Sequence, residues 1–205
     1  MPFIAEVKYR RPALFSETEV VAEFTRISMV PLLSTFMAKL DHYADHLLGV
    51  FKKKGGTAKR NINLIMAAMD GNPSVDVRRE CILKAVCVYL NEKPDDLFKE
   101  FLDVDLGASR ETEQLTLGVY VVRHEGANSA DTPEDIGVII GCTVLQALSD
   151  VAKGCALLLG LIYSLNLSYP KHLKYTFEFL QKVLMELDGN NLSMKVQVLK
   201  NKLLE

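Results

Sequence analysis

Two histidines four residues apart are the first candidate for chemistry in this sequence. His42 and His46 lie in the segment D-H-Y-A-D-H. Residues four apart share one face of a helix, so the two imidazoles could bind a metal ion there. The helical zinc-protease motif needs a glutamate directly after its first histidine, and Tyr43 takes that place here. The pattern therefore favours two solvated surface histidines, and we expect no metal-ligating set in the chain.

A single concentrated basic stretch, K-K-K-G-G-T-A-K-R, could contact phosphates. Its glycines do not match the spacing of a phosphate-binding P-loop, and no aromatic residue is interleaved with its cations to stack on bases. The pattern favours a solvated helix cap followed by a loop. The candidate nucleic-acid-binding residues are its cations: Lys52, Lys53, Lys54, Lys59 and Arg60.

Two pairs of aspartates, Asp95 with Asp96 and Asp103 with Asp105, are the candidates for acid–base catalysis. Paired carboxylates do such work when burial separates their pKa values. These pairs lie in polar segments near the ends of elements, where a negative charge can simply favour a helix N-terminus. The sequence also lacks a serine-nucleophile elbow and a dinucleotide fingerprint. We therefore expect no catalytic residues and no cofactor.

The four cysteines do not suggest a metal site or a disulfide framework. Cys81, Cys87, Cys142 and Cys155 include no C-x-x-C pair, and three of them lie within apolar segments. Tetrahedral zinc sites are usually built from closely spaced pairs. Buried, reduced thiols in an intracellular protein are the expected state.

Composition indicates an ordinary globular chain. Its 205 residues are 49% hydrophobic, enough for one large domain or two small ones with a real core. The net charge of -2 lacks the strong positive bias of a dedicated nucleic-acid binder. Charged residues interrupt the first apolar positions, so no signal peptide is expected at the start. We expect an intracellular location, cytoplasmic or nuclear.

The element that must position everything else is an apolar helix over 150–167. A helix that is apolar on every face lies inside a fold or inside a membrane. Its uncharged run, 154–169, is shorter than the roughly 20 residues that a span requires, so we expect a buried core helix and no membrane association. Small residues at four-residue spacing would let a neighbouring backbone approach closely. The residues that represent this hub are Ala156, Gly160, Leu161, Ser164 and Leu165.

Apolar periodicity predicts helices on both sides of a small sheet. Alternating residues predict three strands of an antiparallel meander over about 115–145, with a tight turn at Gly141-Cys142. Ser16 and Glu19 form a capping-box pattern that starts the first long helix. The predicted helices cover about 16–28, 31–54, 58–69, 75–90, 94–101, 150–167, 170–187 and 193–203.

These elements predict an α+β fold that is mostly α. We expect an irregular arm at 1–15, a helical subdomain at 16–110, and a subdomain at 111–205 that holds the meander and the remaining helices, the hub and two C-terminal ones. We expect the two subdomains to form one continuous domain. The last helix has a basic face, and it could pack within the chain or dock on a partner helix.

Three segments resemble a known group of proteins. They are R-R-E-C-I-L-K-A-V-C-V-Y-L-N-E at 78–92, P-E-D-I-G-V-I-I at 133–140 and the long run L-L-G-L-I-Y-S-L-N-L-S-Y-P-K-H-L-K-Y-T-F-E-F-L-Q-K-V-L-M-E-L at 158–187. The sequence resembles vertebrate proteins, expanded in bony fishes, that are labelled similar to sterile alpha motif domain-containing protein 3, in the region outside the sterile alpha motif. That group has no established activity, so the resemblance implies an intracellular module and assigns no residue a role. Relatives tend to have an acidic residue where this chain has Gly141-Cys142-Thr143.

The sequence therefore predicts a non-enzymatic module that binds another protein or associates with itself as an oligomer. The first alternative is a nucleic-acid-associated protein that uses the stretch 52–60 and a short basic run, Lys8, Arg10 and Arg11. The second alternative is an enzyme whose site is assembled from residues far apart in the chain.

Overall fold

The structure is a computed structural model that describes residues 2–103, 117–127, 131–141 and 143–205. It divides the chain into two compact units, and each unit is made of two separate segments. The first, here called the sheet unit, takes in Met1–Leu33 and Leu97–Ser168; the second, the helical unit, takes in Ser34–Asp96 and Tyr169–Glu205. The unit boundaries therefore fall near residues 33, 96 and 168, and the predicted boundary near residue 110 is not among them. The fold is α+β and mostly α, as predicted.

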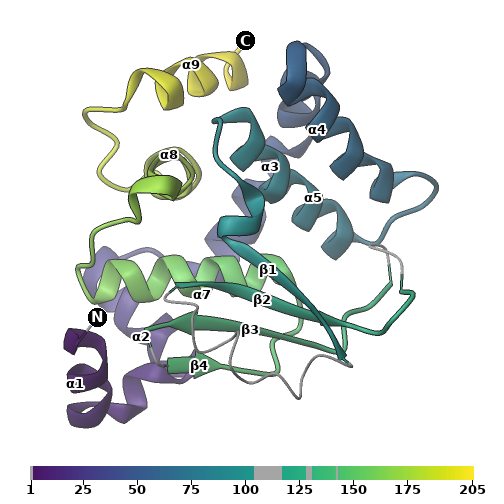
Figure 1. Ribbon diagram of the computed structural model, residues 1–205. Coiled ribbons are helices and arrows are strands. Elements are labelled where there is room, and N and C mark those ends of the chain that lie inside the picture. Colours follow the sequence, from purple (N-terminus) through teal and green to yellow (C-terminus); the bar gives the residue numbers. More distant parts are fainter. Residues whose placement is uncertain (1, 104–116, 128–130, 142) are drawn as a thin grey trace. The chain divides into compact units, whose positions relative to one another are not determined.

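The sheet unit contains four strands and three α-helices among its described residues. Its helices are α1 (Pro2–Arg10), α2 (Glu17–Ser28) and α7 (Val151–Ser164), with a 3₁₀ turn η1 (Pro12–Phe15). Its strands are β1 (Phe98–Leu102), β2 (Leu117–Arg123), β3 (Asp135–Ile140) and β4 (Thr143–Leu145). Their order in the sheet is β1-β2-β3-β4, as Figure 1 shows.

The predicted meander is confirmed as β2-β3-β4. Both of its strand pairs are antiparallel, with Leu117 opposite Ile140 and Val138 opposite Leu145. The predicted turn includes Cys142, which lies outside the described residues, whereas Gly141 has the positive φ of 60° that a tight turn asks of glycine. Every residue of β2 is buried, so this central strand has both faces covered.

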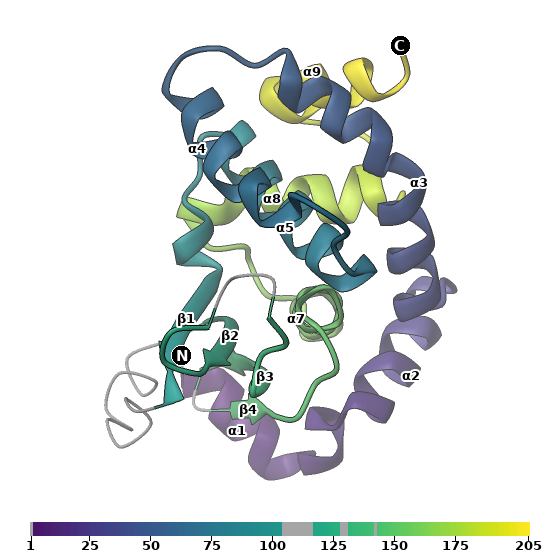
Figure 2. The ribbon, with the colours of Figure 1, turned by 90° about the vertical axis from the view of Figure 1, so that its right-hand side faces the viewer.

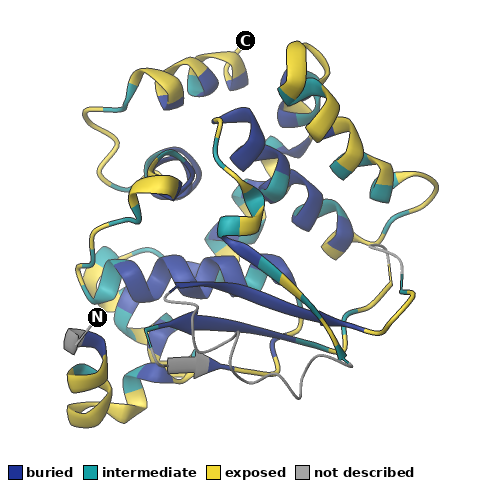
Figure 3. Ribbon diagram, viewed as in Figure 1, coloured by how far each residue is buried: buried dark blue, intermediate teal, exposed yellow. Residues whose placement is uncertain are grey.

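The hub helix α7 packs on β2 and β3 and also contacts α2 (Figure 2). Two glycines allow these close approaches. A methyl group added at Gly154 would lie 2.9 Å from Cγ1 of Val119 on β2. One added at Gly160 would lie 2.6 Å from Leu32 and 3.1 Å from Val20 on α2. Figure 3 shows α7, β2 and β3 buried over most of their length.

The hub is shorter than the predicted span of 150–167. It starts where Asp150 caps it by accepting a hydrogen bond of 2.7 Å from the backbone N–H of Lys153. Ala156, Gly160 and Leu161 are buried, whereas Ser164 and Leu165 are only half-buried because the helix ends at Ser164.

The prediction of an irregular arm at residues 1–15 is wrong. The elements α1 and η1 occupy most of this segment. The side chain of Ile4 is fully buried, and it lies within ordinary contact distance of the Gly141 position at the tip of the β3–β4 turn. A short helix is marginal alone in water, so this packing against the sheet, which no local pattern reports, is what stabilises it.

The prediction of a helix at residues 94–101 is also wrong. The spacing of Leu97, Phe98 and Phe101 suggested a helix, but only Pro94–Asp96 forms a 3₁₀ turn, η3, and β1 follows. β1 pairs in parallel with β2, with Phe98 opposite Val119. Gly118 permits this pairing, since a methyl group there would lie 2.9 Å from the carbonyl oxygen of Leu97. A free edge on β2 thus overrides the helical spacing.

The helical unit holds most of the remaining helices. Its elements are α3 (Leu32–Lys52, apart from its first two residues), α4 (Gly56–Met66), η2 (Ala67–Met69), α5 (Val75–Tyr89), η3, η5 (Lys171–Leu173), α8 (Lys174–Phe179), the π-helical segment η6 (Leu180–Leu184) and α9 (Met194–Leu203). Both C-terminal helices are therefore present, although the first is divided into three helical types. No single helix in the described ranges is long and apolar enough to cross a membrane; α2 and α3 pass that test only when they are joined.

Charged groups connect separate parts of the helical unit. Arg79 on α5 donates two hydrogen bonds, of 2.9 and 2.6 Å, to the carboxylate of Asp41 on α3. Glu92 accepts hydrogen bonds of 2.8 Å from the backbone N–H groups of Tyr175 and Thr176, which begin α8. A carboxylate at a helix N-terminus satisfies donors that have no partner within the helix.

Gly137 on β3 shows how closely the sheet is packed. It lies opposite Tyr120 of β2, and a methyl group added to it would lie 2.3 Å from the carbonyl oxygen of Leu145 and 2.4 Å from the Tyr120 ring. The ring lies over the glycine, and its hydroxyl donates a hydrogen bond of 2.8 Å to Asp135. This packing requires glycine at 137.

We expect Gly137→Ala to lower the free energy of unfolding by about 2 to 3 kcal/mol, the usual cost of forcing atoms into a packed core. The matched control is Gly49→Ala in α3, where an added methyl group has no atom within 4 Å. That control should be neutral or stabilise the chain by up to about 1 kcal/mol, because alanine favours a helix more than glycine does. Urea unfolding followed by circular dichroism measures both, and an unchanged midpoint for Gly137→Ala would contradict the packing described above.

Candidate functional site

The basic stretch lies at the end of α3 and the start of α4. Its five predicted residues do not act as one group. Lys59 donates a hydrogen bond of 2.9 Å to the carbonyl oxygen of Lys52, so it caps the C-terminal end of α3. Lys52 and Arg60 are exposed. Lys53 is also exposed but lines a groove, and Lys54 lies over an aromatic ring, so these two members of the stretch contribute to a site.

Two ammonium groups from distant segments meet on the ring of Tyr89, at the end of α5. The Nζ atom of Lys54 lies 4.4 Å from the ring centroid. The Nζ atom of Lys202, on α9, lies 5.8 Å from that centroid and donates a hydrogen bond of 3.2 Å to the Tyr89 hydroxyl. An aromatic face attracts cations, so this buried ring holds two like charges at one place.

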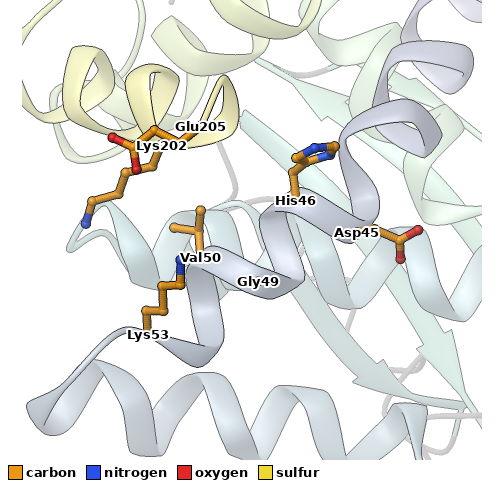
Figure 4. Close-up of a pocket in the computed structure, with 7 residues that line it drawn as sticks. All are labelled: Asp45, His46, Gly49, Val50, Lys53, Lys202 and Glu205. Atoms are coloured by element: carbon orange, nitrogen blue, oxygen red, sulfur yellow. The ribbon is translucent and has the colours of Figure 1, made fainter.

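Beside these cations lies a shallow groove between α3 and α9, which Figure 4 shows in close-up. Its cavity volume is about 400 Å³. Lys53 reaches it from the end of α3, and Lys202 reaches it from α9. The residues that line it are Asp45, His46, Gly49, Val50, Lys53, Lys202 and Glu205.

The electrostatic balance of this groove is positive. Asp45 is bound to the guanidinium of Arg78 at 2.6 Å, so its charge is compensated. None of Lys53, Lys54 and Lys202 forms an ion pair with any residue that the structure describes. Of the residues that line the groove, Lys53 and Lys202 therefore face the carboxylate of Glu205, and Lys54 lies beside them on the ring of Tyr89. We call this place the α3–α9 groove.

The sequence missed Lys202 as a partner of the basic stretch. It lies 142 positions after Arg60, in a helix whose basic face is visible in the sequence but whose neighbour in the fold is not. His42 and His46 are both exposed on α3, and only His46 lines the groove. Asp95 and Asp96 lie in η3, in no cavity that we describe, and Asp105 lies outside the described residues.

A second cluster brings together residues that the sequence did not connect. Nδ1 of His124, directly after β2, lies 2.6 Å from an oxygen of Asp103 and 3.8 Å from an oxygen of Glu134. The backbone N–H of Glu125 donates a further hydrogen bond of 3.3 Å to Asp103. The hydrogen bond to Asp103 is the main cause of the raised pKa of His124, and the charge of Glu134 adds to it. We call this group the sheet-edge cluster.

The three cysteines in the described part of the chain lie in the interior. Cys81, Cys87 and Cys155 are buried thiols, in agreement with the prediction of reduced cysteines. Burial raises the pKa of the Cys87 thiol to about 12, so it stays protonated at neutral pH. Cys142 lies outside the described residues.

Comparison of the chain with models of known protein families, with curated proteins and with solved structures finds no match. The resemblance of 78–92, 133–140 and 158–187 to the sterile alpha motif domain-containing protein 3-like group therefore stays a prediction. The assignment of function rests on the geometry of the groove and of the cluster.

We expect the imidazole of His124 in metal-free protein to titrate above its ordinary pKa of 6.5, and Asp103→Asn to lower that pKa. Glu134→Gln should lower it less, because its effect is through charge alone. Since the folded pKa is raised, the interaction stabilises the folded chain fully below pH 6.5 and is lost as the pH rises through the folded value. Nuclear magnetic resonance of the ring protons measures the titration, and an unshifted curve in Asp103→Asn would contradict the assignment.

Proposed function

We propose that the chain is a non-enzymatic interaction module that binds an acidic segment of a partner protein in the α3–α9 groove. The observation that carries this proposal is that Lys53 and Lys202 line one groove, with Lys54 next to Lys202 on the ring of Tyr89. Like charges repel, and the C-terminal end of α3 offsets only part of that repulsion. An anionic partner in the groove would provide the missing charge, binding Lys53 and Lys202 directly and gaining from the nearby charge of Lys54.

The floor of the groove favours a peptide over a nucleic acid. Val50 and Gly49 provide apolar surface between the cations, which suits a side chain next to an acidic residue. Tyr89 is only 7% exposed and is covered by lysines, so it offers no face on which a base could stack. The net charge of -2 also gives no broad attraction to a phosphate backbone.

The test uses fluorescence anisotropy of a labelled ten-residue peptide in which glutamate and leucine alternate. A glutamine–leucine peptide of the same length is the neutral probe, and a 20-nucleotide single-stranded DNA is the competing class. We expect the acidic peptide to bind more tightly than the neutral one, with an affinity that falls as salt rises. The double variant Lys53→Glu/Lys202→Glu should weaken binding about tenfold, because attraction becomes repulsion.

The matched control is the double variant Lys171→Glu/Lys174→Glu, which makes the same change of charge at two exposed lysines of the helical unit that do not line the groove. It should leave peptide binding unchanged, and circular dichroism confirms that each variant folds. The proposal fails if the acidic peptide does not bind, or if both double variants weaken it equally. If only the DNA binds, if its binding weakens as salt rises, and if Lys52/Lys53/Lys54→Ala abolishes it, the nucleic-acid alternative replaces the proposal.

A further inference from the structure

The sheet-edge cluster is placed by strand register. Leu102 lies opposite Arg123 in the parallel pair of β1 and β2, so the next residues, Asp103 and His124, lie side by side. Val122 lies opposite Asp135 in the antiparallel pair of β2 and β3, which brings Glu134 to the same end of β2. The residues that adjoin three strands therefore place one side chain each at the same edge of the sheet.

The loop that carries the cluster is also anchored. The buried side chain of Arg123 donates a hydrogen bond of 2.8 Å to the carbonyl oxygen of Asp131, which holds the returning segment near the end of β2. The backbone N–H of Glu134 donates one of 2.9 Å to the carbonyl oxygen of Val122. The backbone positions of His124 and Glu134 are thus determined by the sheet.

The ligand atoms have the spacing that a single ion needs. One imidazole nitrogen and one oxygen from each carboxylate all lie within 4.8 Å of one another. Ligands held by an ion at about 2.0 to 2.2 Å stand roughly 3 to 3.5 Å apart. The separation of 3.8 Å between His124 and Glu134 has only to shorten slightly, and that of 2.6 Å between His124 and Asp103 has to lengthen. The side chains of His124 and Glu134 are 65% and 44% exposed, so they can make this adjustment.

The donor set determines the class of ion. Two carboxylates next to a neutral imidazole carry two negative charges, which one divalent ion would compensate. Imidazole nitrogen together with carboxylate oxygen suits Zn²⁺, whereas Mg²⁺ and Ca²⁺ prefer oxygen alone. Three protein ligands leave a fourth position of a tetrahedral ion for water or for a further ligand.

We propose that Asp103, His124 and Glu134 together bind one divalent transition-metal ion, with Zn²⁺ as the preferred ion. The site belongs to the sheet unit and uses no residue of the α3–α9 groove. A test of the metal site can therefore confirm or refute it independently of the proposed peptide binding.

The test is isothermal titration calorimetry of the whole chain with ZnCl₂ at pH 7.5, in a buffer that does not chelate metals. We expect one equivalent of Zn²⁺ to bind, and Mn²⁺ to bind more weakly, following the usual order of affinities. Asp103→Asn, His124→Gln and Glu134→Gln should each weaken Zn²⁺ binding at least about tenfold, because each removes a ligand. Circular dichroism of each variant shows that the loss is local.

Two control variants separate this site from rival ones. Glu125→Gln changes an exposed carboxylate next to His124 that is not part of the ligand set, and it should leave Zn²⁺ binding unchanged. His42→Ala/His46→Ala removes the exposed pair on α3 and should also leave it unchanged. The proposal is overturned if no Zn²⁺ binds, if the three ligand variants bind as the natural chain does, or if the His42→Ala/His46→Ala variant abolishes binding.

Discussion

The packing of one apolar helix on a sheet is the constraint on which the sheet unit depends. Each fully buried leucine of α7 contributes about 1.5 to 3 kcal/mol relative to exposure, but only if its neighbours approach closely. Gly154 provides that approach toward β2 and Gly160 toward α2. Because α7 covers β2 and β3, these strands can be apolar, and their pairing then has one register that buries the correct side chains.

That register has a chemical consequence at the edge of the sheet. Asp103, His124 and Glu134 come together because strand pairing places the ends of β1 and β2 beside the start of β3. None of the three is buried, so their grouping costs little in desolvation, and their charges remain accessible to ions from solvent. The buried sheet thus positions an exposed polar cluster. The strands are stabilised by burial of apolar side chains, whereas the three polar side chains at their ends stay in contact with water.

The helical unit gathers charge in another way. Here Tyr89 provides an aromatic face, and Lys54 and Lys202 reach it from α3 and α9. Other charges of this unit form ion pairs between helices, as Arg79 does with Asp41 and Arg78 with Asp45. The lysines of the α3–α9 groove are different because they form no ion pair with any residue that the structure describes. This difference distinguishes a surface that only stabilises the fold from one suited to a partner.

Local patterns in the sequence determined much of the secondary structure. Alternation predicted β2 and β3, a capping-box pattern predicted the start of α2, and an uncharged apolar run predicted the buried hub α7. Only the tertiary structure decided that 98–102 is a strand and that residues 2–10 are helical, because an open edge on β2 and a pocket for Ile4 exist only once the sheet has formed. The two candidate sites were decided in the same way. Each joins residues that are far apart in the chain, as Lys202 and Lys54 are, and sequence spacing carries no information on contacts that strand register and helix packing create.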